Sequence, residues 1–280
     1  MNLILQGLTA ERTTINSIAA LAGATRIVPI NATAFRCEGV TLTGDIKTAV
    51  DQACLAAQLD YAFVEAGLQL SDFRLLAMDM DSTLITIECI DEIADMQGLK
   101  PQVSAITEAA MRGEIEFNES LTRRVALLAG LDASALQRVF DERLQLSPGA
   151  ENMLAAVKAA GLKTLLVSGG FTFFTDRIKQ QLGLDYAHSN VLDIVDGKLT
   201  GRVIGGIVNA DEKKLTVARI CAELGTTPAA AIVMGDGAND LQMMGIGGMS
   251  VAFRAKPVVR AQADVALNFV GLDGVLNLFG

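Results

Sequence analysis

Three short apolar runs, each ending at a polar residue or glycine, constrain the fold of this chain more than any other feature. The runs and the residues that follow them are Leu75–Met78 before Asp79, Leu165–Val167 before Ser168, and Ile232–Met234 before Gly235. Short, continuously apolar runs separated by helical patterns are typical of parallel strands buried on both faces. Ligands of such sheets bind beyond the carboxyl ends of the strands, so we expect the three ends to face one crevice. The pattern predicts an α/β fold with a Rossmann-like parallel sheet.

The segments around these runs predict helices. Ser147 and Pro148 suit the start of a helix over Glu151–Ala160. A segment from about 89 to 146 is rich in Ala, Leu, Glu and Arg, with helical periodicity and no strand pattern. We interpret it as a helical cap that is inserted into a core over 73–280 and covers the crevice.

The first part of the chain, 1–72, predicts a separate small α/β unit. Strand-like runs at Leu3–Leu5 and Arg26–Pro29 alternate with helical stretches around Thr13–Ala22 and Lys47–Leu59. No cluster of functional side chains occurs in it. A packing or dimerisation module is therefore the favoured interpretation.

The charge of the chain limits its partners. Its 280 residues carry a formal net charge of −9, and no Lys- or Arg-rich run offsets this charge locally. Nucleic acids and anionic membranes are therefore disfavoured as partners. The apolar stretch at Met1–Gly7 is too short for a signal peptide, and no apolar run approaches membrane-spanning length. We expect a protein that acts on a small molecule, as a monomer or homodimer.

Cysteine and histidine usage limits the chemistry. The four cysteines form no CxxC pair, so they indicate neither a zinc site nor a disulfide framework, and a reducing cytoplasm fits best. His188 is the single histidine. This excludes multi-histidine metal sites and phosphatases that need a histidine nucleophile and a second histidine. Carboxylates must carry the chemistry.

Two carboxylates, Asp79 and Asp81, follow the first apolar run in the string DMDSTL. Taken alone, this spacing is also common in loops whose Asp and Ser side chains cap a helix. A calcium-binding loop is disfavoured, because the turn glycine and the terminal glutamate of that pattern are missing.

The second run ends at Ser168, Gly169 and Gly170. Glycines there would let backbone N–H groups approach an anion at the start of a helix near Phe171, although a simple tight turn would have the same sequence. Lys213, near the start of a later helix, could offer its charge to a phosphate or be a solvated helix residue.

The third run ends in the string GDGAND, which places Asp236, Asn239 and Asp240 between and after glycines. It fails as a dinucleotide-binding pattern, because Asp240 stands where the third glycine belongs. An acidic loop at a strand end suits a hard cation that prefers oxygen ligands.

In this order, these residues resemble the four motifs of the haloacid dehalogenase superfamily of phosphotransferases. The resemblance covers about 74–264, with the motifs at Asp79/Asp81, Ser168, Lys213 and Asp236/Asp240. Within the superfamily the chain resembles the phosphoserine phosphatases. The matching strings are DMDSTL, DEIA, MRG, SLTRRV, VSGGF and GDGAND, together with the single residues Glu88 and Phe117. The unit over 1–72 resembles the amino-acid-binding ACT-like modules of some members, in layout only.

The resemblance implies a set of catalytic and metal-binding residues. Asp79 would attack phosphorus to give an aspartyl-phosphate, and Asp81 would protonate the leaving oxygen and later deprotonate water. Mg²⁺ would be held by the Asp79 and Asp236 carboxylates and the Asp81 backbone carbonyl. Asp240 would orient metal-bound waters or support Lys213.

The resemblance also implies how phosphate is bound. Ser168, Gly169 and Lys213 would hold the nonbridging oxygens, with Asn239 beside the phosphate. Lys214 remains an alternative to Lys213, because this helix could turn either lysine toward the crevice.

The expected cap would select the substrate. Glu88 would pair with an ammonium group and Arg124 with a carboxylate. Without the resemblance, Glu88 would be a helix-start carboxylate and Arg124 a solvated helix residue. Met111 and Phe117 would exclude water above the site, or pack inside the cap.

The implied activity is Mg²⁺-dependent hydrolysis of O-phospho-L-serine to L-serine and phosphate, the last step of serine biosynthesis. A phosphotransferase, or a phosphatase for another small phosphoester, is the alternative with the same fold. A catalytically idle amino-acid sensor acting through 1–72 is disfavoured, because every residue expected for catalysis is present.

Overall fold

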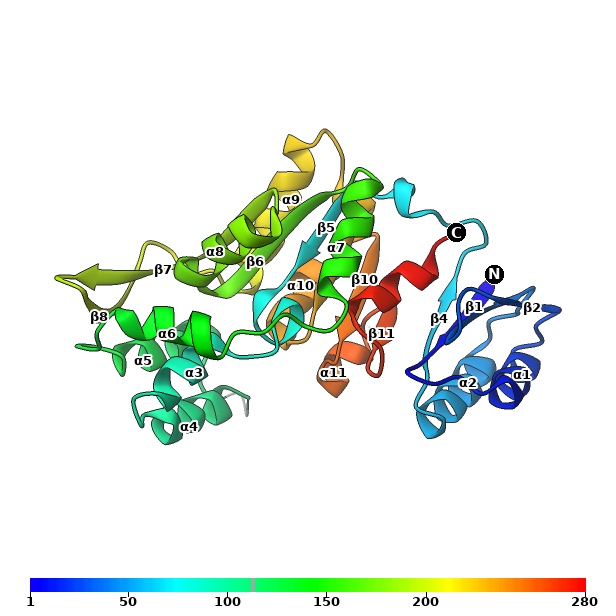
Figure 1. Cartoon of the computed structure of the whole chain (residues 1–280), viewed down its shortest axis with the longest axis horizontal. Helices are drawn as coiled ribbons and strands as arrows, with labels where there is room; N and C mark the ends of the chain where they lie inside the picture. The colour runs from blue at the N-terminus through cyan, green and yellow to red at the C-terminus, as the bar shows by residue number, and fades with distance from the viewer. Residues whose placement is uncertain (112–113) are drawn as a thin grey trace.

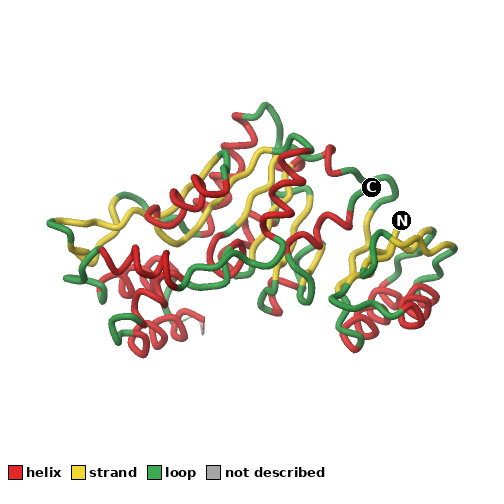
Figure 2. Tube along the Cα trace, viewed as in Figure 1, coloured by secondary structure: helices red, strands yellow, loops and turns green. Residues whose placement is uncertain are grey.

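The computed structural model describes residues 1–111 and 114–280 and contains two sheets, of seven and four strands (Figures 1 and 2). The larger sheet has the order β11-β10-β9-β5-β6-β7-β8 and is parallel except for the β7–β8 pair at one edge. Its strands are β5 (Leu75–Met78), β6 (Lys163–Phe171), β7 (Tyr186–Val195), β8 (Lys198–Ile204), β9 (Ala231–Gly235), β10 (Met249–Phe253) and β11 (Val265–Leu267). The three strands predicted from apolar runs are the adjacent central strands β9, β5 and β6. The predicted α/β class is confirmed.

Both faces of this sheet are buried, which explains why its central strands are apolar without alternation. Leu76 and Met78 of β5 pack into one hydrophobic core together with α7 (Ala150–Ala159) and α8 (Thr172–Leu182). Leu75 and Ala77, which point the opposite way, pack into a second core with α9 (Ala210–Glu223) and α10 (Leu241–Met244). Helices thus cover the sheet on both sides.

The predicted start of α7 at Ser147 and Pro148 is wrong. The helix begins at Ala150, and its N-cap residue is Gly149, which has a φ of 80°. This left-handed conformation breaks the helical path just after Pro148, so Ser147 and Pro148 stay outside the helix.

The second predicted strand runs further than its apolar residues. β6 continues through Ser168, Gly169 and Gly170 to Phe171, with a shift in its register against β7 between Val167 and Phe171. The polar segment is therefore a bulge within the strand, a device that can re-aim side chains toward a site.

Helices occupy the segment that was expected to be a cap, below one end of the sheet in Figure 1. They are α3 (Cys89–Asp95), α4 (Lys100–Met111), α5 (Phe117–Ala126) and α6 (Ser134–Glu142). A bridge between Ile85 and Leu146 joins the two chain segments that lead into and out of this cap. The β7–β8 hairpin, which the sequence did not reveal, reaches over to it: Leu199 exchanges backbone hydrogen bonds of 2.8 Å with Gly130 and Leu131.

The smaller, antiparallel sheet belongs to the N-terminal unit and has the order β2-β3-β1-β4. Its elements follow the chain as β1 (Asn2–Gln6), α1 (Arg12–Leu21), β2 (Arg26–Pro29), β3 (Ala34–Glu38), α2 (Gly44–Ala56) and β4 (Asp60–Val64). This βαββαβ arrangement is ferredoxin-like. Both helices pack on one face, around Leu3, Leu5 and Ile18.

The other face of this small sheet packs against the C-terminal end of the larger unit (Figure 1). Ile4, Ala62 and Val64 share a core with Phe73 and with the last residues of the chain. The buried carboxylate of Asp60 accepts backbone hydrogen bonds of 2.7–3.0 Å from 268–270. The two units are therefore joined by apolar packing and by a buried polar contact.

Candidate active site

A cavity of about 280 Å³ lies where the carboxyl ends of β5, β6 and β9 meet the cap. The predicted site residues that line it are Asp79, Asp81, Glu88, Phe117, Arg124, Ser168, Gly169, Asp236 and Asn239. The structure therefore brings together residues from the sheet and from the cap. Met111 ends α4, but its side chain lies outside the described residues.

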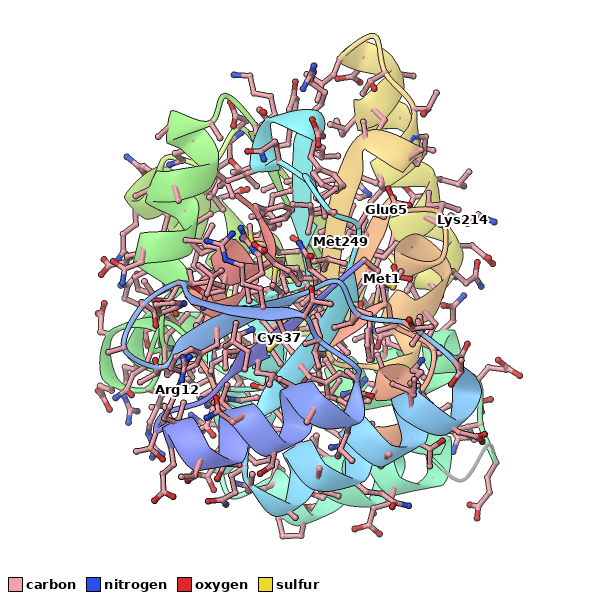
Figure 3. All side chains as sticks on the ribbon, turned by 90° about the vertical axis from the view of Figure 1, so that its right-hand side faces the viewer. Met1, Arg12, Cys37, Glu65, Lys214 and Met249 are labelled. Atoms are coloured by element: carbon pink, nitrogen blue, oxygen red, sulfur yellow. The ribbon has the colours of Figure 1, made fainter. Side chains whose placement is uncertain are left out.

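Lys213 is fully buried beneath the site and is not among the residues that line the cavity. Its Nζ lies 2.8 Å from Oδ1 of Asp79 and donates a 2.7 Å hydrogen bond to Oδ1 of Asp240. Lys214, the next residue on α9, is exposed and points away from the protein in Figure 3. The orientation of α9 thus places Lys213, and not Lys214, toward the site.

Asp240 holds this arrangement in place with both of its oxygens. Oδ1 accepts from Lys213, while Oδ2 accepts from the backbone N–H groups of Asp236 and Gly237 at 3.2 and 3.0 Å. A β-carbon on Gly235 would lie 2.5 Å from that of Asp240, so only glycine fits there. Asp240 therefore orients the acidic loop and the lysine together.

The carboxylates of the site have raised pKa values because the cavity is poorly solvated. Burial, and then Asp240 and Asp236, raise the pKa of Asp79 well above its usual range, although Lys213 opposes them. Burial and the nearby Glu88 raise the pKa of Asp81 to about 8, and burial and Asp240 raise that of Asp236 to about 7. A cation bound among these groups would offset their mutual repulsion.

The residues at the strand ends fit a hard divalent cation. Carboxylate oxygens of Asp79, Asp236 and Asp240 lie within 4.8 Å of one another. Asp79 Oδ1 is buried and has no aligned hydrogen-bond donor among the described residues. Because Asp240 already accepts three N–H groups, Asp79 and Asp236 are the carboxylates left to bind a metal.

The turn after β5, Met80–Leu84, sets the direction of the second carboxylate. Ser82 has a φ of 56°, a left-handed conformation that is uncommon outside glycine and that tends to occur at functional sites. Asp81 leaves the helical path here, and its Oδ1 accepts a 3.3 Å hydrogen bond from the N–H of Cys89. This bond fixes Asp81 beside Asp79 at the cavity.

The β6 bulge brings a hydroxyl group and backbone to the cavity wall. Ser168 Oγ accepts a 2.8 Å hydrogen bond from the N–H of Gly170, and Asn190 Nδ2 donates one of 2.7 Å to the carbonyl of Gly169. A β-carbon on Gly170 would lie 2.9 Å from Met80 Cε and 3.0 Å from Asp81 Oδ2. The glycine thus permits the bulge to approach the catalytic turn. Sequence reasoning missed Asn190, which lies on a strand it did not detect.

The cap contributes Glu88, Arg124 and Phe117 to the cavity wall. Glu88 is the N-cap residue of α3, but its side chain does not cap that helix and instead accepts a 2.7 Å hydrogen bond from Ser82 Oγ. Arg124 Nε donates a long, 3.4 Å bond to the carbonyl of Ser120. Phe117 lies so close to Gly169 that a β-carbon there would be 3.0 Å from its ring.

Two further charged residues line the cavity, Asp91 and Lys256. Neither residue was predicted from the sequence to belong to the site. Lys256 follows β10, a strand that was not predicted. The apolar run Val251–Phe253 was the signal that would have revealed this fourth strand end.

Comparisons with known proteins agree with this geometry. The family model for haloacid dehalogenase-like hydrolases matches residues 73–248. A phosphoserine phosphatase of Polaromonas sp. is 58% identical over 216 residues, which make up 75% of this chain and 92% of the relative.

Solved structures extend the likeness to the N-terminal unit. A haloacid dehalogenase family hydrolase of Salmonella enterica serovar Typhi has a TM-score of 0.89 and 36% identity, covering 100% of this chain and 99% of its own. A probable phosphoserine phosphatase of Vibrio cholerae has a TM-score of 0.84 and 36% identity, covering 99% of this chain and 85% of its own. The chain therefore belongs to the haloacid dehalogenase-like hydrolases, and within them to the phosphoserine phosphatase family.

Proposed function

We propose that this protein hydrolyses O-phospho-L-serine to L-serine and phosphate, as the last step of serine biosynthesis. The proposal rests on one observation. The same cavity is lined by an acid pair, Asp79 and Asp81, and by a carboxylate and a guanidinium group on the cap, Glu88 and Arg124. The first pair suits phosphoryl transfer, and the second suits the ammonium and carboxylate groups of an amino acid. The relatives named as phosphoserine phosphatases support the same activity.

In the first step, an Asp79 carboxylate oxygen attacks phosphorus and the bond to the serine oxygen breaks. This divides one difficult displacement into two easier ones, through an aspartyl-phosphate. Mg²⁺, held by Asp79, Asp236 and the Asp81 carbonyl, would supply positive charge between the nucleophile and the phosphate. Lys213, through its contact with Asp79, keeps the carboxylate in place and offsets part of its charge.

Asp81 first donates a proton and later accepts another one. Burial and Glu88 raise the pKa of Asp81 to about 8, which favours the protonated form that a general acid needs at neutral pH. Asp81 gives this proton to the departing serine oxygen. The resulting carboxylate then takes a proton from the water that hydrolyses the aspartyl-phosphate.

The remaining residues bind the substrate. Ser168, the backbone of Gly169, and Asn239 line the cavity beside Asp79, where they would hold the phosphate oxygens. Across the cavity, Glu88 would bind the ammonium group and Arg124 the carboxylate of phosphoserine. Phe117, with Met111, would exclude water from the closed site.

The test is release of phosphate from O-phospho-L-serine, measured with Mg²⁺ and again with excess chelator. We expect turnover that depends on the metal. A product analysis in the presence of an added alcohol distinguishes hydrolysis from transfer to that alcohol. Absence of phosphoserine turnover, with activity on other phosphoesters, would show that the fold serves a different substrate.

We place the reaction in the cytoplasm, because all four cysteines are free and buried. We further propose that the protein is a monomer or a homodimer. None of the described helices combines the length and the apolar character needed to cross a membrane. We also propose that 1–72 is an ACT-like domain and that 73–280 is the catalytic domain, with a cap over about 89–146.

A further inference from the structure

The lining of the active-site cavity has an excess of negative charge. Among the described residues that line it, five are carboxylates and only two, Arg124 and Lys256, are cationic. A phosphate monoester is itself a dianion near neutral pH, so each cation that faces the cavity matters for its entry. Arg124 already has a role at the substrate carboxylate, which leaves Lys256.

The backbone fixes Lys256 next to the metal-binding loop. The residue is the N-cap of α11 (Pro257–Arg260), and the proline that follows it holds the start of this short helix. The N–H of Lys256 donates a 3.2 Å hydrogen bond to the carbonyl of Asp236. The root of the side chain is therefore tied to the loop that carries Asp236.

Lys256 is exposed and lines the cavity. Within the described part of the chain it makes no ion pair or side-chain hydrogen bond, unlike the fully buried Lys213. Its charge nevertheless reaches the cavity wall, where it opposes the burial that raises the pKa of Glu88. Among the described residues it is thus a cation without an ion-pair partner, in the wall of the cavity where an anion must bind.

We propose that Lys256 is a substrate-binding residue that admits the phosphoryl group, offsetting Glu88 and Asp236 and binding the phosphate at the cavity entrance. This inference rests on the proposed function only in that the substrate is a phosphate monoester. A charge near the rim of a site acts mainly on the rate of association and on its salt dependence. Lys256 should therefore affect kcat/KM more than kcat.

The matched variants are Lys256→Gln, Lys256→Arg and, as a control, Arg260→Gln. Arg260 lies on the same short helix but lines a separate cavity of about 640 Å³ beside α2. We expect Lys256→Gln to lower kcat/KM for phosphoserine about fivefold, with a shallower dependence on salt. Lys256→Arg should keep most of the activity, and Arg260→Gln should behave as the unchanged protein.

A second measurement does not depend on turnover. Inorganic phosphate, titrated calorimetrically into the Mg²⁺-loaded protein, should bind about fivefold more weakly to Lys256→Gln than to Arg260→Gln. Equal phosphate affinities in these two variants, or a fall in kcat with KM unchanged, would overturn the proposal and show that Lys256 only holds the Asp236 loop. Failure of the unchanged protein to hydrolyse phosphoserine would refute the proposed function, and the phosphate titration would still decide the role of Lys256.

Discussion

The half of the site on the sheet and the half on the cap are built differently. On the sheet, Asp79, Lys213 and Asp240 are almost completely buried, and Lys213 Nζ lies 2.8 Å from Asp79 Oδ1 and 2.7 Å from Asp240 Oδ1. On the cap, Arg124 donates a 3.4 Å bond to its own helix and forms no ion pair within 4 Å with any described residue, and Glu88 accepts a hydrogen bond from Ser82. The groups for the chemistry are thus locked together before substrate arrives, while the groups for recognition keep capacity for new partners.

This difference predicts which substrates each half affects. Electrostatic groups that are preorganised around the reacting atoms act on every phosphoester. Groups that bind an ammonium or a carboxylate act only on substrates that carry one. Mutations in the two halves should therefore differ in selectivity as well as in size.

The largest effect is expected from Asp79→Asn on the sheet. An amide cannot replace the carboxylate nucleophile, so turnover of all phosphoesters and formation of the aspartyl-phosphate should be abolished. Rapid acid quench, or trapping with beryllium fluoride, measures the phosphoenzyme. Lys213 keeps Asp240 as a partner in this variant, so circular dichroism should show an intact fold. Turnover near the original rate would refute the mechanism.

The next largest effect concerns the affinity for Mg²⁺ and its dependence on pH. Because the pKa of Asp236 is raised to about 7, a proton competes with Mg²⁺ below that pH. Mg²⁺ affinity, measured by calorimetry, should therefore increase as the pH rises from about 6 to about 8. Asp236→Ala should weaken Mg²⁺ binding sharply while leaving the fold intact. Activity that survives both this mutation and excess chelator would mean that the acidic loop is structural.

The same groups give the metal-free protein a stability that depends on pH. Burial raises the pKa values of Asp81 and Asp236 in the folded state to about 8 and about 7. Their contribution to stability is fully present below the pKa of the unfolded chain and is lost as the pH rises through these folded values. The Tm without metal should fall across this range, and Mg²⁺ should restore it. A Tm that does not change with pH would contradict the raised pKa values.

A smaller and selective effect is expected from Arg124→Ala on the cap. Removing the guanidinium leaves the substrate carboxylate unpaired in a covered site, at a cost of about 2 to 5 kcal/mol in kcat/KM for phosphoserine. Para-nitrophenyl phosphate has no carboxylate, so its kcat/KM should change little. Equal losses for the two substrates would show that Arg124 positions the cap or the catalytic groups.

The two halves also differ in how far the sequence revealed them. Asp79, Ser168 and Asp236 follow apolar runs, and strand geometry alone predicts that such ends converge. Glu88 and Arg124 could be assigned only through family resemblance, because a glutamate at a helix start and an arginine on a helix have ordinary structural roles. The side chain of Glu88 does not cap its own helix. This depends on the tertiary structure and cannot be predicted from a local sequence pattern.

Several of the features that the sequence missed have a physical cause. β7 and β8 form a partly exposed hairpin in which polar and apolar residues are mixed, and β3 and β4, which flank β1 in the smaller sheet, contain buried and partly exposed residues. The contacts of Asn190 and Lys256 depend on strands that were not detected. Lys213 and Lys214 could not be separated, because a shift of one residue reverses which lysine faces the sheet.

The smallest effect is expected from Glu88→Gln, which keeps the size of the side chain and removes its charge. Glutamine still accepts the hydrogen bond from Ser82, so the cap should keep its position. The lost charge-assisted bond to the substrate ammonium should cost about 1.5 to 3 kcal/mol with phosphoserine. O-Phospholactate, which lacks the ammonium group, should be turned over by this variant nearly as well as by the unchanged protein. Parallel losses for the two substrates would instead place Glu88 among the groups that orient Asp81, whose pKa it raises. In that case, catalysis and substrate recognition could no longer be assigned separately to the sheet and to the cap.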